Sequence, residues 1–245
     1  MSLLEPRPLV AAAIAAGVIA VMSCGSSTAT PGPTSTDVHP PVPTPTPVDP
    51  RALLDASGRV MEDLDSFHFR LTHRSGNTPV SGNFVVDEAE GEVVKPDRIS
   101  AKFSGSFGGF AINSGLITLG ELSFMTNPLT DKWESVPPEV SPLGFFDPRR
   151  GIAAIMSQVE QPSIVPGSDG TYRIAGRLPA GALRSLLGNA LRDATVDVVL
   201  TMDAEALHLL EAVIDGRVTS AEEDGVVRVI TLSRFDEPFV IEPPL

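Results

Sequence analysis

Hydrophobic and polar residues alternate with a period of two along most of residues 66–235, which is typical of strands with one buried face. In the first such segment Phe67, Phe69 and Leu71 fall on one side, and His68 and Arg70 on the other. Further segments follow at Thr78–Asp87, Arg98–Gly105, Phe107–Asn113, Leu116–Thr126, Thr171–Leu178, Val196–Met202, Leu207–Asp215 and Val226–Phe235. We interpret Gly76-Asn77, Gly91, Gly105, Gly115, Gly120-Glu121 and Asp215-Gly216 as turns. The pattern predicts a large antiparallel meander.

Three segments have helical spacing instead. The first begins after Asp49-Pro50, which supply a cap and a first-turn proline, and its apolar stripe is Leu53, Ala56, Val60 and Leu64. The second opens at Asp147-Pro148, with Ile152, Ile155, Met156 and Val159. The third opens at Pro179, with Leu183, Leu186, Leu187 and Leu191. The last two are too apolar to stand free, so we expect an α+β fold in which helices press against one face of a wide, curved antiparallel sheet.

The N-terminus carries an apolar run from Leu9 to Met22, followed by Ser23 and Cys24, the one cysteine of the chain. The run is shorter than the roughly 20 residues that span a bilayer, and it suits the apolar region of a signal peptide. An apolar run, a small residue and then cysteine indicate a lipoprotein signal peptide over residues 1–23, with lipid on Cys24. A plain secretory signal and an uncut anchor are the alternatives, although an odd cysteine in an exported protein needs an explanation.

Residues 24–50 form a Pro/Thr-rich tail that holds eight prolines between Pro31 and Pro50. Proline has a fixed φ and no N–H, so this segment is expected to be a disordered, extended tether, or else a leader of no consequence. The remaining residues, 51–245, are expected to form a single domain. We therefore place the domain outside the cytoplasm, held at the cell membrane by Cys24.

The formal net charge is −13, which excludes nucleic acid as a partner because phosphate contacts need a basic patch. No nucleophile elbow and no glycine-rich phosphate loop is found. His68 and His73 lie five residues apart on one strand, so they point to opposite faces and cannot share a metal. We expect no cofactor, no metal and no enzymatic activity, although an acid pair assembled from distant carboxylates stays an alternative.

The same alternation supplies candidates for the lining of an apolar cavity between sheet and helices. The residues expected on the sheet side are Phe69, Leu71, Phe84, Phe103, Phe110, Ile112 and Phe124, and those on the helix side are Ile155, Met156, Leu183 and Leu187. Periodicity does not distinguish a hollow core from a filled one, since both require an apolar face. We expect the loop Pro137 to Asp147 to act as a gate, with a plain connector as the alternative.

Several short motifs occur in an order and spacing that resemble the LppX/LprA/LprF/LprG family of mycobacterial-type lipoproteins. They are Ser66-Phe67-His68-Phe69, Val94-Lys95-Pro96-Asp97-Arg98-Ile99, Lys132-Trp133, Thr171-Tyr172-Arg173-Ile174-Ala175-Gly176, and Leu232 to Pro243. The resemblance covers essentially all of residues 51–245. One departure is Phe124, where the family usually has tyrosine.

The resemblance implies a half-barrel, similar to periplasmic lipoprotein carriers, wrapped around helices with an apolar cavity between them. It implies acyl lipids or glycolipids as ligands, a role in moving them through the cell envelope, and an envelope transporter as a candidate partner. An envelope sensor or scaffold that binds a protein with the same fold is the alternative, because a fold does not decide function.

Overall fold

The computed structural model describes residues 48–244, apart from 81–83, 128–129, 138–150 and 186–189. Its main feature is one large antiparallel sheet that is open rather than closed into a barrel. The strands are β1 (Ser66–Ser75), β2 (Thr78–Pro79), β3 (Phe84–Val94), β4 (Arg98–Phe107), β5 (Phe110–Leu119), β6 (Leu122–Thr126), β7 (Trp133–Val136), β8 (Glu160–Val165), β9 (Thr171–Pro179), β10 (Thr195–Asp203), β11 (Leu209–Asp215) and β12 (Val227–Ser233). The helices are α1 (Pro50–Asp63), α2 (Gly151–Ser157) and the 3₁₀ helix η1 (Ala180–Ser185).

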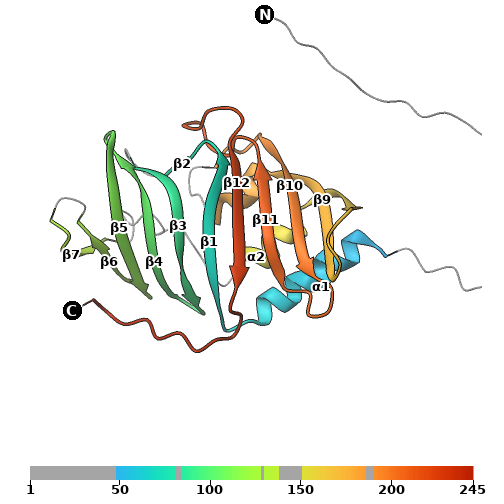
Figure 1. Cartoon of the computed structure of the whole chain (residues 1–245), viewed down its shortest axis with the longest axis horizontal. Helices are drawn as coiled ribbons and strands as arrows, with labels where there is room; N and C mark the ends of the chain where they lie inside the picture. Colours follow the sequence, from blue (N-terminus) through green and yellow to red (C-terminus); the bar gives the residue numbers. More distant parts are fainter. Residues whose placement is uncertain (1–47, 81–83, 128–129, 138–150, 186–189, 245) are drawn as a thin grey trace, which may run out of the picture. The chain divides into compact units, whose positions relative to one another are not determined.

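The strand order is β7-β6-β5-β4-β3-β1-β12-β11-β10-β9-β8, with β2 paired to β3 outside this path (Figure 1). The chain meanders outward from β1 to β7, and it returns through α2 to β8 and back inward to β12. The pairing of β1 with β12 therefore joins the two halves of the sheet, with Phe69 opposite Leu232 and Leu71 opposite Ile230. The predicted α+β fold, a wide and curved antiparallel sheet with helices, is confirmed.

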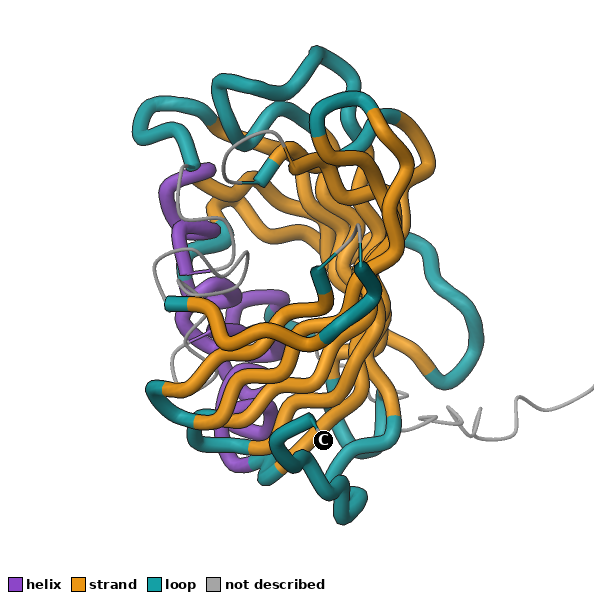
Figure 2. The backbone as a smooth tube through the Cα atoms, turned by 90° about the vertical axis from the view of Figure 1, so that its left-hand side faces the viewer, coloured by secondary structure: helices purple, strands orange, loops and turns teal. Residues whose placement is uncertain are grey.

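Both α-helices lie on one side of the curved sheet (Figure 2). We call the sheet face toward them the inner face, and the opposite one the outer face. In α1, as predicted, Asp49 is the N-cap, accepting a hydrogen bond of 2.9 Å from the Arg51 amide, and Pro50 stands in the first turn. No helix among the described residues has the length and apolar character needed to cross a membrane.

Side-chain hydrogen bonds to backbone carbonyls fix both ends of α1. The Nζ atom of Lys95 donates to the carbonyls of Met61 and Glu62 at 2.9 and 2.6 Å, which satisfies carbonyls at the C-terminus of α1. At the other end of α1, the guanidinium of Arg51 donates to the carbonyls of Ser157, the last residue of α2, and of Val159, two residues later. Lys95 thus ties α1 to the β3–β4 connection, and Arg51 ties α1 to α2.

The stripe expected on the first helix is displaced by one residue. The buried positions of α1 are Leu54, Ser57, Gly58 and Met61, whereas Leu53 is only partly buried. The displacement arises because α1 packs against both the sheet and α2, and Gly58 faces Ala153 of α2. A Cβ added at Gly58 would come within 3.6 Å of the Ala153 Cα, so the small residue lets the two helices approach closely.

Three glycines predicted to be turns lie inside strands instead. Gly91 belongs to β3, Gly105 to β4 and Gly115 to β5. A Cβ at Gly91 would collide with the Ser100 carbonyl, and one at Gly105 with the Val85 carbonyl, so these glycines allow a neighbouring backbone to come close. The strand predicted over Thr78–Asp87 is accordingly two strands, β2 and β3, and β3 continues past Gly91 to Val94.

Other boundaries also differ from the sequence predictions. The segment Leu116–Thr126 includes the turn at Gly120 and so belongs to both β5 and β6, while β7 and β8 were not predicted. The second helix is described from Gly151, and the third is a short 3₁₀ helix after Pro179, which itself ends β9. Leu186, Leu187 and all of the predicted gate except Pro137 lie outside the described residues.

Candidate functional site

A cavity of about 190 Å³ lies between the inner face and the helical layer. It exceeds the volume of about 150 Å³ at which an engineered apolar cavity stays dry and takes up benzene. Apart from Thr78 and Arg228, its described lining is apolar, so it favours an apolar ligand. The lining residues are Phe67, Phe69, Leu71, Thr78, Ile99, Ile152, Ile155, Met156, Val159, Leu178, Leu183, Val198, Leu200, Leu209, Ala212, Ile214, Arg228, Ile230 and Leu232.

Alternating side chains along the strands form the sheet wall of this cavity. Residues paired directly across two strands lie on the same face, so Ile230, opposite Leu71, also points inward. The same parity places Ala212, which pairs with Ile230 and Leu200, on the cavity. The β11 side chain at this point is only a methyl group, and the wall is correspondingly thin.

Five of the predicted lining residues meet at this cavity. Phe69 and Leu71 reach it from β1, Ile155 and Met156 from α2, and Leu183 from η1. Met156 and Leu183 are almost fully buried. Residues predicted on the sheet side and residues predicted on the helix side therefore line the same cavity.

Four other predicted residues face inward but lie farther along the sheet. Phe103 pairs with Ala89, which pairs with Leu71, so it shares the inner face but belongs to a separate cluster with Phe84 and Ile112. Phe110, near the β4–β5 turn, is 79% exposed. These four residues do not line the cavity of about 190 Å³, because strands β3 to β5 carry them away from α2 and η1.

Phe124 and Leu187 complete the predicted set. Phe124 pairs with Ile117, and that row continues through Ser100 and Glu92 to His68. The row alternates with the one that holds Phe69, so Phe124 lies on the outer face, and its assignment to the cavity is corrected. Leu187 lies outside the described residues.

Sequence reasoning missed Thr78 and Arg228, the two polar residues among the described lining. Arg228 takes the same parity on β12 as Ile230 and Leu232, and it pairs with His73 on β1. A charged residue at an inward position of an otherwise apolar strand was the signal that could have identified it.

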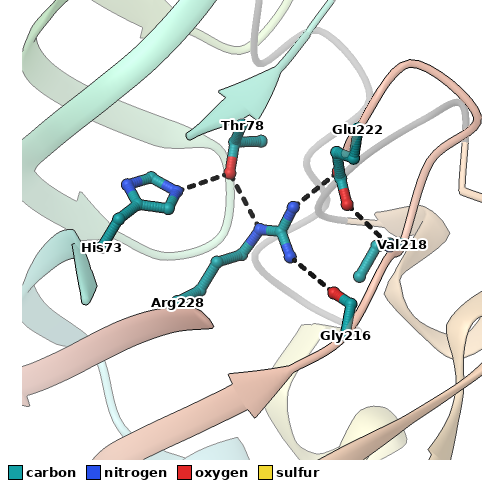
Figure 3. Close-up of polar contacts among 6 residues, drawn as sticks. All are labelled: His73, Thr78, Gly216, Val218, Glu222 and Arg228. Carbon is teal, nitrogen blue, oxygen red and sulfur yellow. Dashed lines mark hydrogen bonds and ion pairs between the residues drawn. The ribbon is translucent and has the colours of Figure 1, made fainter. Parts of the chain in front are cut away.

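The polar groups of Arg228 and Thr78 belong to a buried polar cluster with Glu222, Gly216 and Val218 (Figure 3). The Arg228 Nε donates to Thr78 Oγ1 at 2.8 Å, and its Nη1 donates to the Gly216 carbonyl at 3.3 Å. The Nη2 lies 2.5 Å from Oε1 of Glu222, whose other oxygen accepts the Val218 amide at 2.7 Å. Arg228 and Glu222 are buried together, which is tolerable only because each compensates the charge of the other.

His73 extends the cluster. Its Nδ1 lies 2.7 Å from the Asp87 carbonyl and its Nε2 2.8 Å from Thr78 Oγ1. We assign the proton to Nδ1, because a carbonyl can only accept, so the Thr78 hydroxyl donates to Nε2 and accepts from Arg228. Burial lowers the pKa of His73, and the nearby Arg228 charge acts in the same direction, while the bond to Asp87 opposes it. The ring is therefore held neutral.

The open antiparallel half-barrel with two α-helices on one side is the fold of a class of lipoproteins. A model of the LppX_LprAFG lipoprotein family matches residues 49–241, so the chain belongs to this family. The match spans the whole of the described sheet and both α-helices.

Two solved structures have the same fold. The crystal structure of LprF from Mycobacterium bovis aligns with a TM-score of 0.60 at 20% identity, covering 79% of this chain and 96% of LprF. That of Mycobacterium tuberculosis lipoprotein LppX aligns with a TM-score of 0.55 at 19% identity, covering 80% of this chain and 100% of LppX. A comparison with curated protein sequences gives no significant match. Family membership suggests lipid binding or carrying rather than catalysis.

Proposed function

We propose that this protein binds the acyl chains of lipids or glycolipids in the cavity between the inner face and α2 and η1, and carries or chaperones them in the cell envelope. The observation that carries the proposal is an apolar cavity of about 190 Å³ whose described lining has two polar side chains. Each buried methylene stabilises a bound chain by about 0.8 kcal/mol. In the form described, the volume suits a segment of one chain.

The N-terminal sequence supports a location for this protein in the cell envelope. A precursor cut before Cys24 and acylated on that thiol would hold the domain at the outer side of the membrane. The tail over residues 24–50 would act as a spacer between the membrane and the domain that starts near Pro50. An envelope transporter would then be a partner that loads or unloads the cavity.

The test is mass spectrometry of lipid extracted from the native protein, released from its tether by proteolysis within residues 25–47 so that the anchor stays behind. Stoichiometric acyl lipid is expected. Ala212→Phe extends a ring from β11 into the cavity, and by filling it should remove this lipid without unfolding the domain. Ala111→Phe is the matched control, because Ala111 lies exposed on β5 and does not line the cavity, and it should retain the lipid.

A protein that is free of lipid, and that also fails to take up added acyl chains, would overturn the proposal. The second candidate, a scaffold that binds a protein, would then be favoured by the apolar side chains exposed at the β4–β5 turn, where Phe107 is 43% and Phe110 79% exposed. In that case Phe110→Ser should weaken the partner complex and leave the fold intact.

A further inference from the structure

The turn between β4 and β5 exposes two aromatic rings to solvent. Phe107 ends β4 and Phe110 begins β5, and the two residues pair across Gly108 and Gly109. Both glycines have positive φ, 57° and 86°, as the central residues of a type I′ turn require. A Cβ added to either glycine would meet no heavy atom of the described residues within 4 Å, so the turn has free space around it. We call residues 107–110 the hairpin tip.

The hairpin tip is also uncharged. Residues 103–120 contain no Asp, Glu, Lys or Arg, although these four residue types make up 20% of the chain. Phe110 is nevertheless 79% exposed and Phe107 43% exposed, and apolar side chains gathered on a surface often mark a contact with a protein or a membrane. The formal net charge of −13 gives the protein no attraction to anionic headgroups, so a membrane contact at the hairpin tip would depend on burial of the rings.

The size of the hairpin tip favours a bilayer over a protein partner. The exposed parts of the two rings amount to roughly 200–300 Å², whereas a stable protein interface buries about 800 Å² on each partner. A contact this small would not hold a protein complex by itself. A bilayer contact can be smaller, because stable attachment to membranes commonly combines two weak signals, and the anchor proposed on Cys24 would supply the other one.

Apolar contacts connect the hairpin tip to the cavity along the inner face. The ring centroids of Phe107 and Phe84 lie 4.6 Å apart, and those of Phe84 and Phe103 lie 6.4 Å apart. Phe103 belongs to the apolar cluster against which Leu71 packs, and Leu71 also lines the cavity. An acyl chain that leaves a bilayer at the hairpin tip would therefore meet apolar side chains on the inner face as far as the cavity.

We propose that Phe107 and Phe110 dock the hairpin tip on the surface of a lipid bilayer, with both rings buried at the boundary between headgroups and acyl chains. This inference rests on the proposed lipid-binding function and deepens it, because it specifies where the domain exchanges acyl chains with a membrane. Gly108 and Gly109 contribute a turn narrow enough for both rings to enter the bilayer together.

The test uses residues 24–245 with Cys24→Ser and Ala111→Cys, so that the single thiol carries an environment-sensitive fluorophore next to the hairpin tip. Since this chain has no anchor, any membrane contact has to come from the protein itself. Titration with phosphatidylcholine vesicles should raise the fluorescence of the label and shift its emission to shorter wavelength. The same label on Glu121→Cys, in the turn at the other end of β5, is the control and should not respond.

Two further variants show whether the ring causes the response. Phe110→Ser should raise the vesicle concentration that gives half of the fluorescence change about tenfold, because the more exposed ring no longer enters the bilayer. The variant should fold as wild type, since Phe110 is mostly in solvent. Leu122→Ser is the matched control, because Leu122 is 57% exposed but follows the turn at the other end of β5. It should leave the titration unchanged, and vesicles that also contain phosphatidylglycerol should bind no more tightly.

The outcomes distinguish this inference from the function on which it rests. A label at residue 111 that does not respond to vesicles, or that responds equally in Phe110→Ser, would overturn docking and leave the hairpin tip as a surface for a protein partner. Binding that requires phosphatidylglycerol would also overturn it. Unlabelled Phe110→Ser should bind a water-soluble acyl probe as tightly as wild type, because Phe110 does not line the cavity. If the wild type does not bind this probe while the label responds to vesicles, lipid binding in the cavity fails and docking is supported.

Discussion

The Nε2 atom of His73 lies 2.8 Å from Oγ1 of Thr78, and this contact joins the end of β1 to the buried ion pair through Arg228. The ring is neutral in the folded protein because burial lowers its pKa below the ordinary value of 6.5. Of the other charged groups that act on it, Arg228 lowers the pKa further, and Asp87 and Glu222 raise it. The free energy of unfolding of the domain is therefore linked to pH through His73.

The sign of that linkage follows from which state binds the proton. Below about pH 6.5 the unfolded chain binds a proton at His73 that the folded protein resists, so the free energy of unfolding falls as the pH falls through 6.5 toward the lowered pKa. Melting temperatures at pH 7.5, 6.5 and 5.5 should decrease in that order. His73→Asn, which does not titrate, should show a shallower decrease, and an unchanged slope would contradict the assignment.

Replacing Lys95 with methionine should destabilise the domain by about 1 kcal/mol. The substitution keeps most of the aliphatic stem but removes the ammonium group that bonds the carbonyls at the end of α1 and interacts with the helix dipole. Urea denaturation with an unchanged m-value measures the effect. Lys102→Met, at an exposed position of β4 outside this contact, should have almost no effect, and equal losses in both variants would rule out a specific cap.

Opposite results are expected from two substitutions at Gly58. Gly58→Ala should stabilise the domain by about 1 kcal/mol, because alanine favours the helix and its Cβ would make only ordinary contact with Ala153. Gly58→Leu should destabilise it by about 1–3 kcal/mol, since the larger side chain pushes α1 away from α2. Thermal unfolding of the pair checks both, and two destabilised variants would show that the helices leave no room even for a methyl group.

Cys24→Ser tests the proposed lipid anchor. The serine variant lacks the thiol that we propose carries the lipid, so it should move from the detergent phase to the aqueous phase in a phase-separation assay, while Ser26→Ala should stay in the detergent phase. The intact mass of the native protein should exceed that of residues 24–245 by the mass of the attached lipid. A mass without lipid would indicate the plain secretory signal instead.

The sequence predicted the parts of the fold that local alternation determines. The run from Phe67 to Leu71 has unbroken parity, so its inner face was assigned correctly. Strand β8 was missed because Pro162 interrupts its pattern, and proline is compatible with a strand only at an edge or a bulge. The turn prediction at Gly91 failed because one residue type serves both turns and close backbone approaches, and only the partner strand distinguishes them.

The site was predicted where parity and helix position agree, as at Phe69 and Met156. Phe124 was assigned to the wrong face because parity is not carried through the turn at Gly120 by any local rule. Phe103 was assigned correctly to the inner face, but it lies too far along the sheet to line the cavity. The extent of the cavity along the sheet depends on where α2 lies, which the alternation within a strand does not determine. The pairing of Arg228 with Glu222, six residues earlier, depends on how the irregular β11–β12 connection folds back to the beginning of β12, and periodicity does not describe such a connection.

The edge strand β8 has a consequence for how copies of this protein coexist. An open sheet presents unpaired backbone groups at its border, and such borders recruit strands from other molecules. In β8 the pairing register shifts between Glu160 and Ser163, Gln161 has a φ of 48°, and Pro162 has no N–H to offer. At this border a neighbouring molecule finds no continuous template, so β8 resists the edge-to-edge pairing that would join copies of the half-barrel into polymers.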